Sequence, residues 1–109
     1  MSWKVKFFQT ARGEYPVKNF IEQLERSGYL KAFRSIRLLE KFGPFIKPPY
    51  AKKIQGRLCE LRVVGKDSIR IFYMQQKDTY YLLHAFKKNT QKTPQKEITL
   101  ALDRLHTVI

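Results

Sequence analysis

The sequence has few groups that could form a disulfide or a metal site. Its 109 residues include one cysteine, Cys59, and two histidines, so an internal disulfide is impossible and a cysteine-based metal site is excluded. A single cysteine is typical of a reducing compartment, and we expect Cys59 to be a small core residue. The sequence also contains no glycine-rich phosphate loop and no nucleophile elbow.

Long apolar runs are missing as well. No stretch approaches the roughly 18 consecutive apolar residues of a membrane-spanning helix. The first six residues contain neither an apolar run nor a small-residue cleavage site, which are the marks of a signal peptide. We therefore expect a cytoplasmic protein with no membrane partner.

Acidic residues are scarce. Nine Asp and Glu stand against 22 Lys and Arg, which gives a net charge of +13. The acids of the middle of the chain, Glu60, Asp67 and Asp78, lack the clustering that a magnesium nuclease needs, so we expect no metal and no cofactor. The positive excess suits a polyanionic partner, and nucleic acid is the first candidate.

Apolar and aromatic residues are plentiful, at 43% and 14% of the chain. That is enough for a packed core, and the length suits one domain over residues 1–109. Hydrophobic spacing predicts strands at 3–7, 57–64, 68–75 and 79–86, and helices at 16–28, at 29–42 and from Thr93 onward. Gly28 is expected to end the first helix in a left-handed conformation, and Thr93 to cap the last one with Pro94 as its first residue. Pro48-Pro49 predicts an irregular connector over 45–56.

This β-α-α-β-β-β-α order predicts an α+β fold. A helical hairpin and a C-terminal helix are expected to cover one face of an antiparallel sheet.

Two arginines are predicted to face each other on neighbouring strands. If the Gly65-Lys66-Asp67 loop leaves Val64 opposite Ser68, the apolar residues of both strands share the buried side, and Arg62 lies directly across from Arg70. Like charges in that position are destabilising. One interpretation is that an anion normally lies between them; the other is that both arginines are solvated and point apart.

Positive charge is concentrated around these strands, because residues 45–92 hold 11 of the basic and 3 of the acidic residues. The run from Lys87 and Lys88 to Lys92 leads to the start of the last helix, where free N–H groups favour a phosphate. We favour phosphate binding there over simple solvation. Lys52, Lys53 and Arg57 are further candidates for RNA contacts.

Four consecutive segments resemble the HigB branch of the RelE superfamily, which are toxins of bacterial type II toxin-antitoxin modules. They read GRLCELR at 56–62, SIRIFY at 68–73, LLHAFKK at 82–88 and QKTPQKEI at 91–98, followed by Ala101 and Arg104. The similarity covers most of the chain and is strongest from 56 to 104.

The resemblance implies a RelE-like α+β fold and ribosome-dependent cleavage of messenger RNA without a metal. It also implies a small helix-turn-helix antitoxin as partner. By motif, the RNA-facing residues are Arg62, Arg70, Lys87, Lys88 and Lys92, which are the basic residues already chosen from the pattern.

The groups that would move protons are less well defined. Cleavage without a metal requires a base for the 2′-OH, cations for the phosphorane-like transition state and an acid for the 5′-oxygen. Lys87, Lys88, His84 and Tyr73 are the candidates for proton transfer, although a lone histidine in a strand is more often structural. The runner-up function is a basic module that binds RNA or the ribosome without cleaving.

Overall fold

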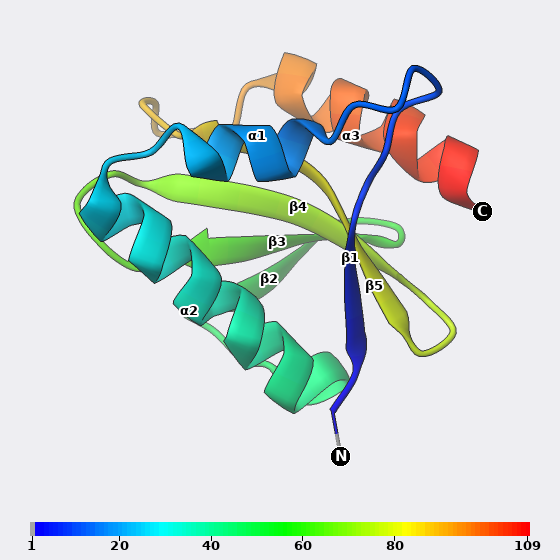
Figure 1. The fold of residues 1–109 in the computed structure, drawn as a ribbon, viewed down its shortest axis with the longest axis horizontal. Helices are drawn as coiled ribbons and strands as arrows, with labels where there is room; N and C mark the ends of the chain where they lie inside the picture. The colour runs from blue at the N-terminus through cyan, green and yellow to red at the C-terminus, as the bar shows by residue number, and fades with distance from the viewer. Residues whose placement is uncertain (1) are drawn as a thin grey trace.

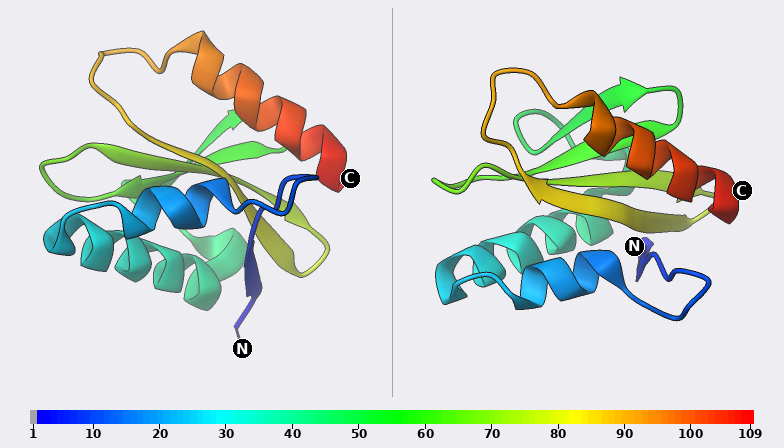
Figure 2. Two further views of the ribbon diagram at one scale, coloured as in Figure 1. Left: turned by 45° about the horizontal axis from the view of Figure 1, so that its top comes forward. Right: turned by 90° about the horizontal axis from the view of Figure 1, so that it is seen from above.

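The computed structural model describes residues 2–109, and Figure 1 labels its helices and strands. These elements form three layers with a five-stranded sheet in the middle (Figure 2). The strand order is β1-β5-β4-β3-β2. In chain order the elements are β1 Lys4–Phe7, α1 Pro16–Glu22, α2 Arg26–Phe42, the short 3-10 helix η1 Gly43–Phe45, β2 Ala51–Gln55, β3 Leu58–Val63, β4 Ile69–Gln76, β5 Thr79–Lys87 and α3 Gln95–Val108. The predicted α+β class is confirmed.

The helices cover both faces of the sheet, whereas the sequence predicted one (Figure 2). One core lies under α1 and α2 and includes Val17, Leu39, Leu61 and Ile71. The second core lies under α3 and includes Leu58, Phe72, Met74, Leu83, Ala101 and Leu105. Because β4 carries apolar residues at consecutive positions 71–74, both of its faces need a cover.

The register that brings the two arginines together is confirmed. In the antiparallel β3–β4 pair, Arg62 is opposite Arg70, Leu61 is opposite Ile71 and Val63 is opposite Ile69. Apolar alternation determines this register, because a slip by one residue would move Leu61 out of the core. The pair therefore occupies the face that α3 covers, together with Phe72.

The connector predicted over 45–56 is not irregular throughout. Residues 51–55 form β2, which pairs with β3 at the edge of the sheet, with Lys52 opposite Glu60 and Lys53 opposite Cys59. Pro48 and Pro49 precede the strand, so neither removes a hydrogen bond from its ladder. The edge position needs only one buried face, which explains the weak apolar signal of Ala51–Gln55.

Two helix boundaries also differ from the prediction. Gly28 is a buried residue inside α2 and not a left-handed end; α1 stops at Glu22 and α2 starts at Arg26. The face that carries Ala32, Ile36 and Leu39 extends back to Gly28 in helical phase, so the helix begins before the glycine.

The last helix starts later than predicted. Pro94, with an extended backbone, is the N-cap and precedes the first helical residue, Gln95, so no side-chain hydrogen bond caps the helix. Glu97 places a carboxylate in the first turn, where it interacts favourably with the helix dipole.

The sheet is antiparallel except at one edge, where β1 pairs with β5 in parallel. None of the helices in residues 2–109 has the length and the apolar composition needed to cross a membrane.

Candidate functional site

The two facing arginines share a buried carboxylate from the same strand face. Oε1 of Glu60 accepts a hydrogen bond of 3.0 Å from Nε of Arg62, and it lies 3.6 Å from Nε of Arg70. Glu60 is 2% exposed. Its position two residues before Arg62 on β3 places both side chains on the α3 side of the sheet. Glu60 therefore supplies a carboxylate between the two arginines, where one of the two interpretations placed an anion.

Arg70 is less completely paired than Arg62. Its side chain is 16% exposed, so it is not one of two solvated arginines that point apart, which was the other interpretation of the sequence. Its Nε is buried without a hydrogen-bond partner, because 3.6 Å to Glu60 is an ion-pair distance and too long for a hydrogen bond. Two guanidinium groups thus share one carboxylate, so Glu60, Arg62 and Arg70 together carry a net positive charge.

A second polar group lies on the same face, next to the arginines. Nε2 of His84 lies 2.8 Å from Oε1 of Glu97 on α3, and Nδ1 lies 3.4 Å from a guanidinium nitrogen of Arg104. That same nitrogen of Arg104 donates a 2.8 Å hydrogen bond to the carbonyl of Leu83. Helix α3 therefore clamps the histidine from two sides.

Burial determines the protonation of His84. Desolvation lowers its pKa below the usual value, Arg104 lowers it further, and the contact with Glu97 opposes both effects. The ring is therefore neutral near pH 7. We assign the proton to Nε2, which donates to Glu97, so that Nδ1 can accept from Arg104.

Aromatic rings connect the two polar groups. Phe86 is opposite Arg70 and Phe72 is opposite His84 in the β4–β5 register. The ring of Phe86 stacks on His84 at 5.6 Å and meets Phe72 edge-on at 5.2 Å. We call this arrangement the arginine strip, which comprises Glu60, Arg62, Arg70, His84, Glu97 and Arg104.

The predicted site residues other than Arg62, Arg70 and His84 lie on both faces of the sheet and in the loop before α3. Lys52, opposite Glu60, shares the face of the strip, and the backbone N–H of Lys88 donates to Ser68, close to Arg70 in sequence. Lys92 is exposed in the loop before α3. Arg57 lies at the other end of β3, where it donates hydrogen bonds to the carbonyl of Gln75 and the side chain of Gln76.

Tyr73, Lys53 and Lys87 stand on the opposite face. Tyr73 belongs to the core under α1 and α2, and its register partner is Cys59, which is also opposite Lys53. Burial is the largest of the effects that raise the pKa of the Tyr73 hydroxyl far above its usual value. Lys87 is opposite Ile69 of the same core, at the exposed end of β5. The strands therefore do not bring these three side chains together with the arginines.

Three members of the strip were not predicted as site residues. Glu60 was considered only as a possible metal ligand, although its spacing from Arg62 places it on the same strand face. Glu97 and Arg104 are seven residues apart, which puts both on one side of a helix after two turns. That they face His84 depends on how α3 packs, and no pattern in the sequence gives this information.

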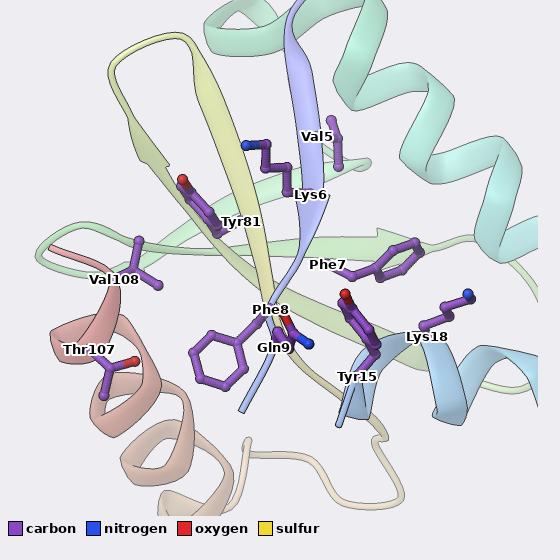
Figure 3. Close-up of a pocket in the computed structure, with 10 residues that line it drawn as sticks. All are labelled: Val5, Lys6, Phe7, Phe8, Gln9, Tyr15, Lys18, Tyr81, Thr107 and Val108. Carbon is purple, nitrogen blue, oxygen red and sulfur yellow. The ribbon is translucent and has the colours of Figure 1, made fainter. Parts of the chain in front are cut away.

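A separate hollow lies between β1, the start of α1 and the end of α3 (Figure 3). Lys6, Tyr15, Lys18, Tyr81 and Thr107 are among its lining residues, and none of the predicted site residues lines it. Within residues 2–109, no group of three or more His, Cys, Asp or Glu side chains is placed to hold a metal ion.

The comparisons with known proteins assign a family. The model of the phage-derived protein Gp49-like family (DUF891) matches residues 19–106, which spans every element from α2 to the end of the arginine strip on α3. No curated protein matches the sequence significantly. The family is toxin-like, which fits the basic site described above, and the chain belongs to the phage-derived Gp49-like family.

Proposed function

We propose that this protein is the toxin of a type II toxin-antitoxin module of the HigB branch of the RelE superfamily. In this proposal it is a cytoplasmic, ribosome-dependent endoribonuclease that cleaves messenger RNA. The observation that carries the proposal is the pair Arg62 and Arg70, held side by side by the buried carboxylate of Glu60. Membership of the Gp49-like family is compatible with this function.

The arginine pair would stabilise the transition state of phosphodiester cleavage. Arg62 uses its Nε for Glu60, so the two terminal nitrogens of its guanidinium can approach a phosphate in the bidentate manner that arginine favours. Arg70, with its incompletely paired Nε, adds a second cation. Because Glu60 fixes both groups before RNA arrives, little reorganisation is needed when charge develops on the phosphorane.

Lysines would bind the flanking RNA and take part in proton transfer. Lys88 follows β5 beside the strip, Lys92 lies in the loop before α3, and Lys87 is the last residue of β5, on the opposite face. In this proposal a lysine accepts the proton of the 2′-OH. Lys52 adds charge on the strip face, whereas Lys53 and Arg57 would contact RNA only outside the strip.

A non-cleaving RNA-binding or ribosome-binding module is the second candidate. The state of His84 favours this candidate. Both ring nitrogens of His84 already have partners: Nε2 contacts Glu97 and Nδ1 contacts Arg104. To accept a proton from RNA, His84 would first have to lose the contact with Arg104. Without a group that accepts the proton of the 2′-OH, the strip binds RNA without cutting it.

Inducible expression followed by mapping of messenger RNA 5′ ends distinguishes the two candidates. We expect growth arrest and new 5′ ends from the natural protein, and neither from Arg62→Ala or Arg70→Ala. Lys18→Ala, an exposed residue on α1, is the control and should behave like the natural protein. Growth arrest without new 5′ ends would favour the binding module. Unchanged cleavage by both arginine variants would show that the arginine strip is not the cleavage site.

The proposed partner is a small helix-turn-helix antitoxin. A chain with a net charge of +13 should associate with an acidic partner at a rate that falls as salt increases. Hydrogen exchange of the toxin with and without the antitoxin locates the contact. Protection across residues 57–92 would support direct cover of the strip, and protection confined to residues 3–42 would contradict it.

A further inference from the structure

Large apolar side chains are exposed along one side of α2 and just beyond it. Phe45 in η1 is 68% exposed, and Phe42, Tyr50 and Val64 are also exposed. Two adjoining hollows, of about 430 Å³ and 350 Å³, share Leu38 and Tyr50 as lining residues. We call the combined hollow the α2 groove; its apolar lining is Leu38, Phe42, Phe45, Ile46, Tyr50 and Val64.

The apolar residues gather at the end of α2. Leu38 and Phe42 lie at positions i and i+4 of the helix, and Phe45 follows in η1, just beyond its end. From Lys31 to Phe42 the groove follows α2 for roughly 16 Å, at about 1.5 Å per residue. Exposed apolar side chains gathered in this way are typical of protein-binding surfaces, and the length of the groove along α2 matches about three turns of a partner helix.

The charged residues of the groove are all cationic. Lys31, Arg34 and Lys47 line it, and no carboxylate does so among the residues that the structure places there. Lys31 packs closely against Gly65: a Cβ at that glycine would lie 3.1 Å from its Nζ. The ammonium group of Lys31 therefore lies beside Gly65, at one end of the groove.

We infer that the α2 groove binds an amphipathic helix of another protein, with apolar residues on one face and Asp or Glu beside them. The apolar lining would bury the partner's apolar face, and the three cations would pair with its carboxylates. The groove is built from α2, η1 and the loops beside β2 and β3, whereas the arginine strip lies under α3 on the other side of the sheet. The two surfaces can therefore be tested separately.

Two other occupants fit the groove less well. A second copy of this chain would bring another net charge of +13 and its own groove cations, which repel those already present. An anionic lipid surface would attract the cations, but a flat bilayer does not enter a concave groove. A single acidic helix satisfies both the shape and the charge.

The test uses a synthetic amphipathic peptide of about 18 residues, labelled with a fluorophore, with a leucine stripe flanked by glutamates. A second peptide keeps the leucines and replaces every glutamate by lysine. Fluorescence anisotropy with the full chain should detect binding of the acidic peptide and at least about tenfold weaker binding of the lysine peptide. Equal binding of the two peptides would overturn the inference.

Single substitutions locate the peptide. Phe45→Ser and Leu38→Ser should each weaken binding at least about tenfold, as expected for residues at the centre of an interface. Leu100→Ser on α3, which is also an exposed apolar residue, and Arg70→Gln in the strip should leave it unchanged. Phe45→Ser loses an edge-on ring contact with Trp3 at 6.2 Å, but its ring is mostly exposed, so its melting temperature should fall only slightly. A melting curve of each variant separates loss of binding from unfolding.

The same variants detect the other occupants. If sedimentation shows that the natural protein forms dimers that Phe45→Ser abolishes, the groove binds a second copy. If the protein binds phosphatidylglycerol vesicles through Phe45 and does not bind the acidic peptide, the groove binds lipid. Peptide binding that depends on Arg70 and not on Phe45 would also overturn the inference.

Discussion

Glu60 accepts a 3.0 Å hydrogen bond from Arg62, two residues further along the same strand. The carboxylate is almost completely buried, and a charge so placed is costly unless it is paired. Arg70 supplies a second cation from β4 at 3.6 Å. The shared carboxylate explains how two arginines can face each other without their repulsion forcing β3 and β4 apart.

Replacement of the shared carboxylate should therefore destabilise the fold. In Glu60→Gln, the facing guanidinium groups lose the charge that compensates them, and we expect the free energy of unfolding to fall by about 3 kcal/mol. Urea denaturation measures the loss. The double variant Glu60→Gln, Arg70→Gln removes the repulsion as well and should recover part of the stability. A single variant as stable as the natural protein would show that Glu60 does not hold the pair together.

The arginines should also determine how RNA binding depends on salt. Each phosphate contact of a single-stranded RNA contributes about 0.7 to the slope of log affinity against log salt concentration. Arg62→Gln should therefore reduce the slope by about 0.7 and weaken binding of an RNA oligonucleotide at low salt. Filter binding at several salt concentrations measures both quantities, with Lys18→Gln on α1 as the matched charge control. An identical slope for Arg62→Gln and the natural protein would contradict a phosphate contact.

The sequence predicts best what apolar alternation determines. The β3–β4 register follows from Leu61, Val63 and Ile71, because each must reach the core, and the facing arginines follow from that register. The edge strand β2 was missed because Lys52 and Lys53 face solvent and contribute no apolar signal. The cover of both sheet faces was also missed, since an amphipathic helix does not indicate which face it packs against.

The candidate site was predictable in part for the same reason. Arg62 and Arg70 were found from register alone, but the internal anion was overlooked, although the spacing between Glu60 and Arg62 places them on one face. Tyr73 was assigned to the site from its chemistry, while its alternation with Phe72 puts it on the opposite face. The clamp on His84 depends on the docking of α3, which is a tertiary contact that local patterns do not encode.

Gly43 should be one of the least replaceable glycines. Its φ is +49°, and a Cβ there would lie 2.4 Å from the ring of Trp3. Gly43→Ala adds an overlap with a packed indole to the strain of a left-handed backbone, and we expect a loss of about 3 kcal/mol or more.

Gly56 provides the matched control, because its φ is +55° and nothing lies within 4 Å of the position of a Cβ. Gly56→Ala should cost only the backbone term, about 1 to 2 kcal/mol. Urea denaturation of both variants separates the two contributions. Equal losses would show that the contact with Trp3 relaxes without cost.

His84 should make stability depend on pH. Burial lowers its pKa in the folded protein below the ordinary value of 6.5, despite the opposing contact with Glu97. Between the two values the unfolded chain binds a proton that the folded chain does not, so stability falls as pH decreases through the range below 6.5. Above that range both states are neutral and the effect vanishes. Melting temperatures between pH 7.5 and 5 should therefore decline more steeply for the natural protein than for His84→Gln.

A second variant tests the contact with Glu97. In Glu97→Gln the histidine loses the group that raises its pKa, so the decline in melting temperature should continue to lower pH than in the natural protein. Parallel curves for the natural protein and His84→Gln would mean that the imidazole takes up a proton as readily in the folded state as in the unfolded one, and that burial does not keep it neutral.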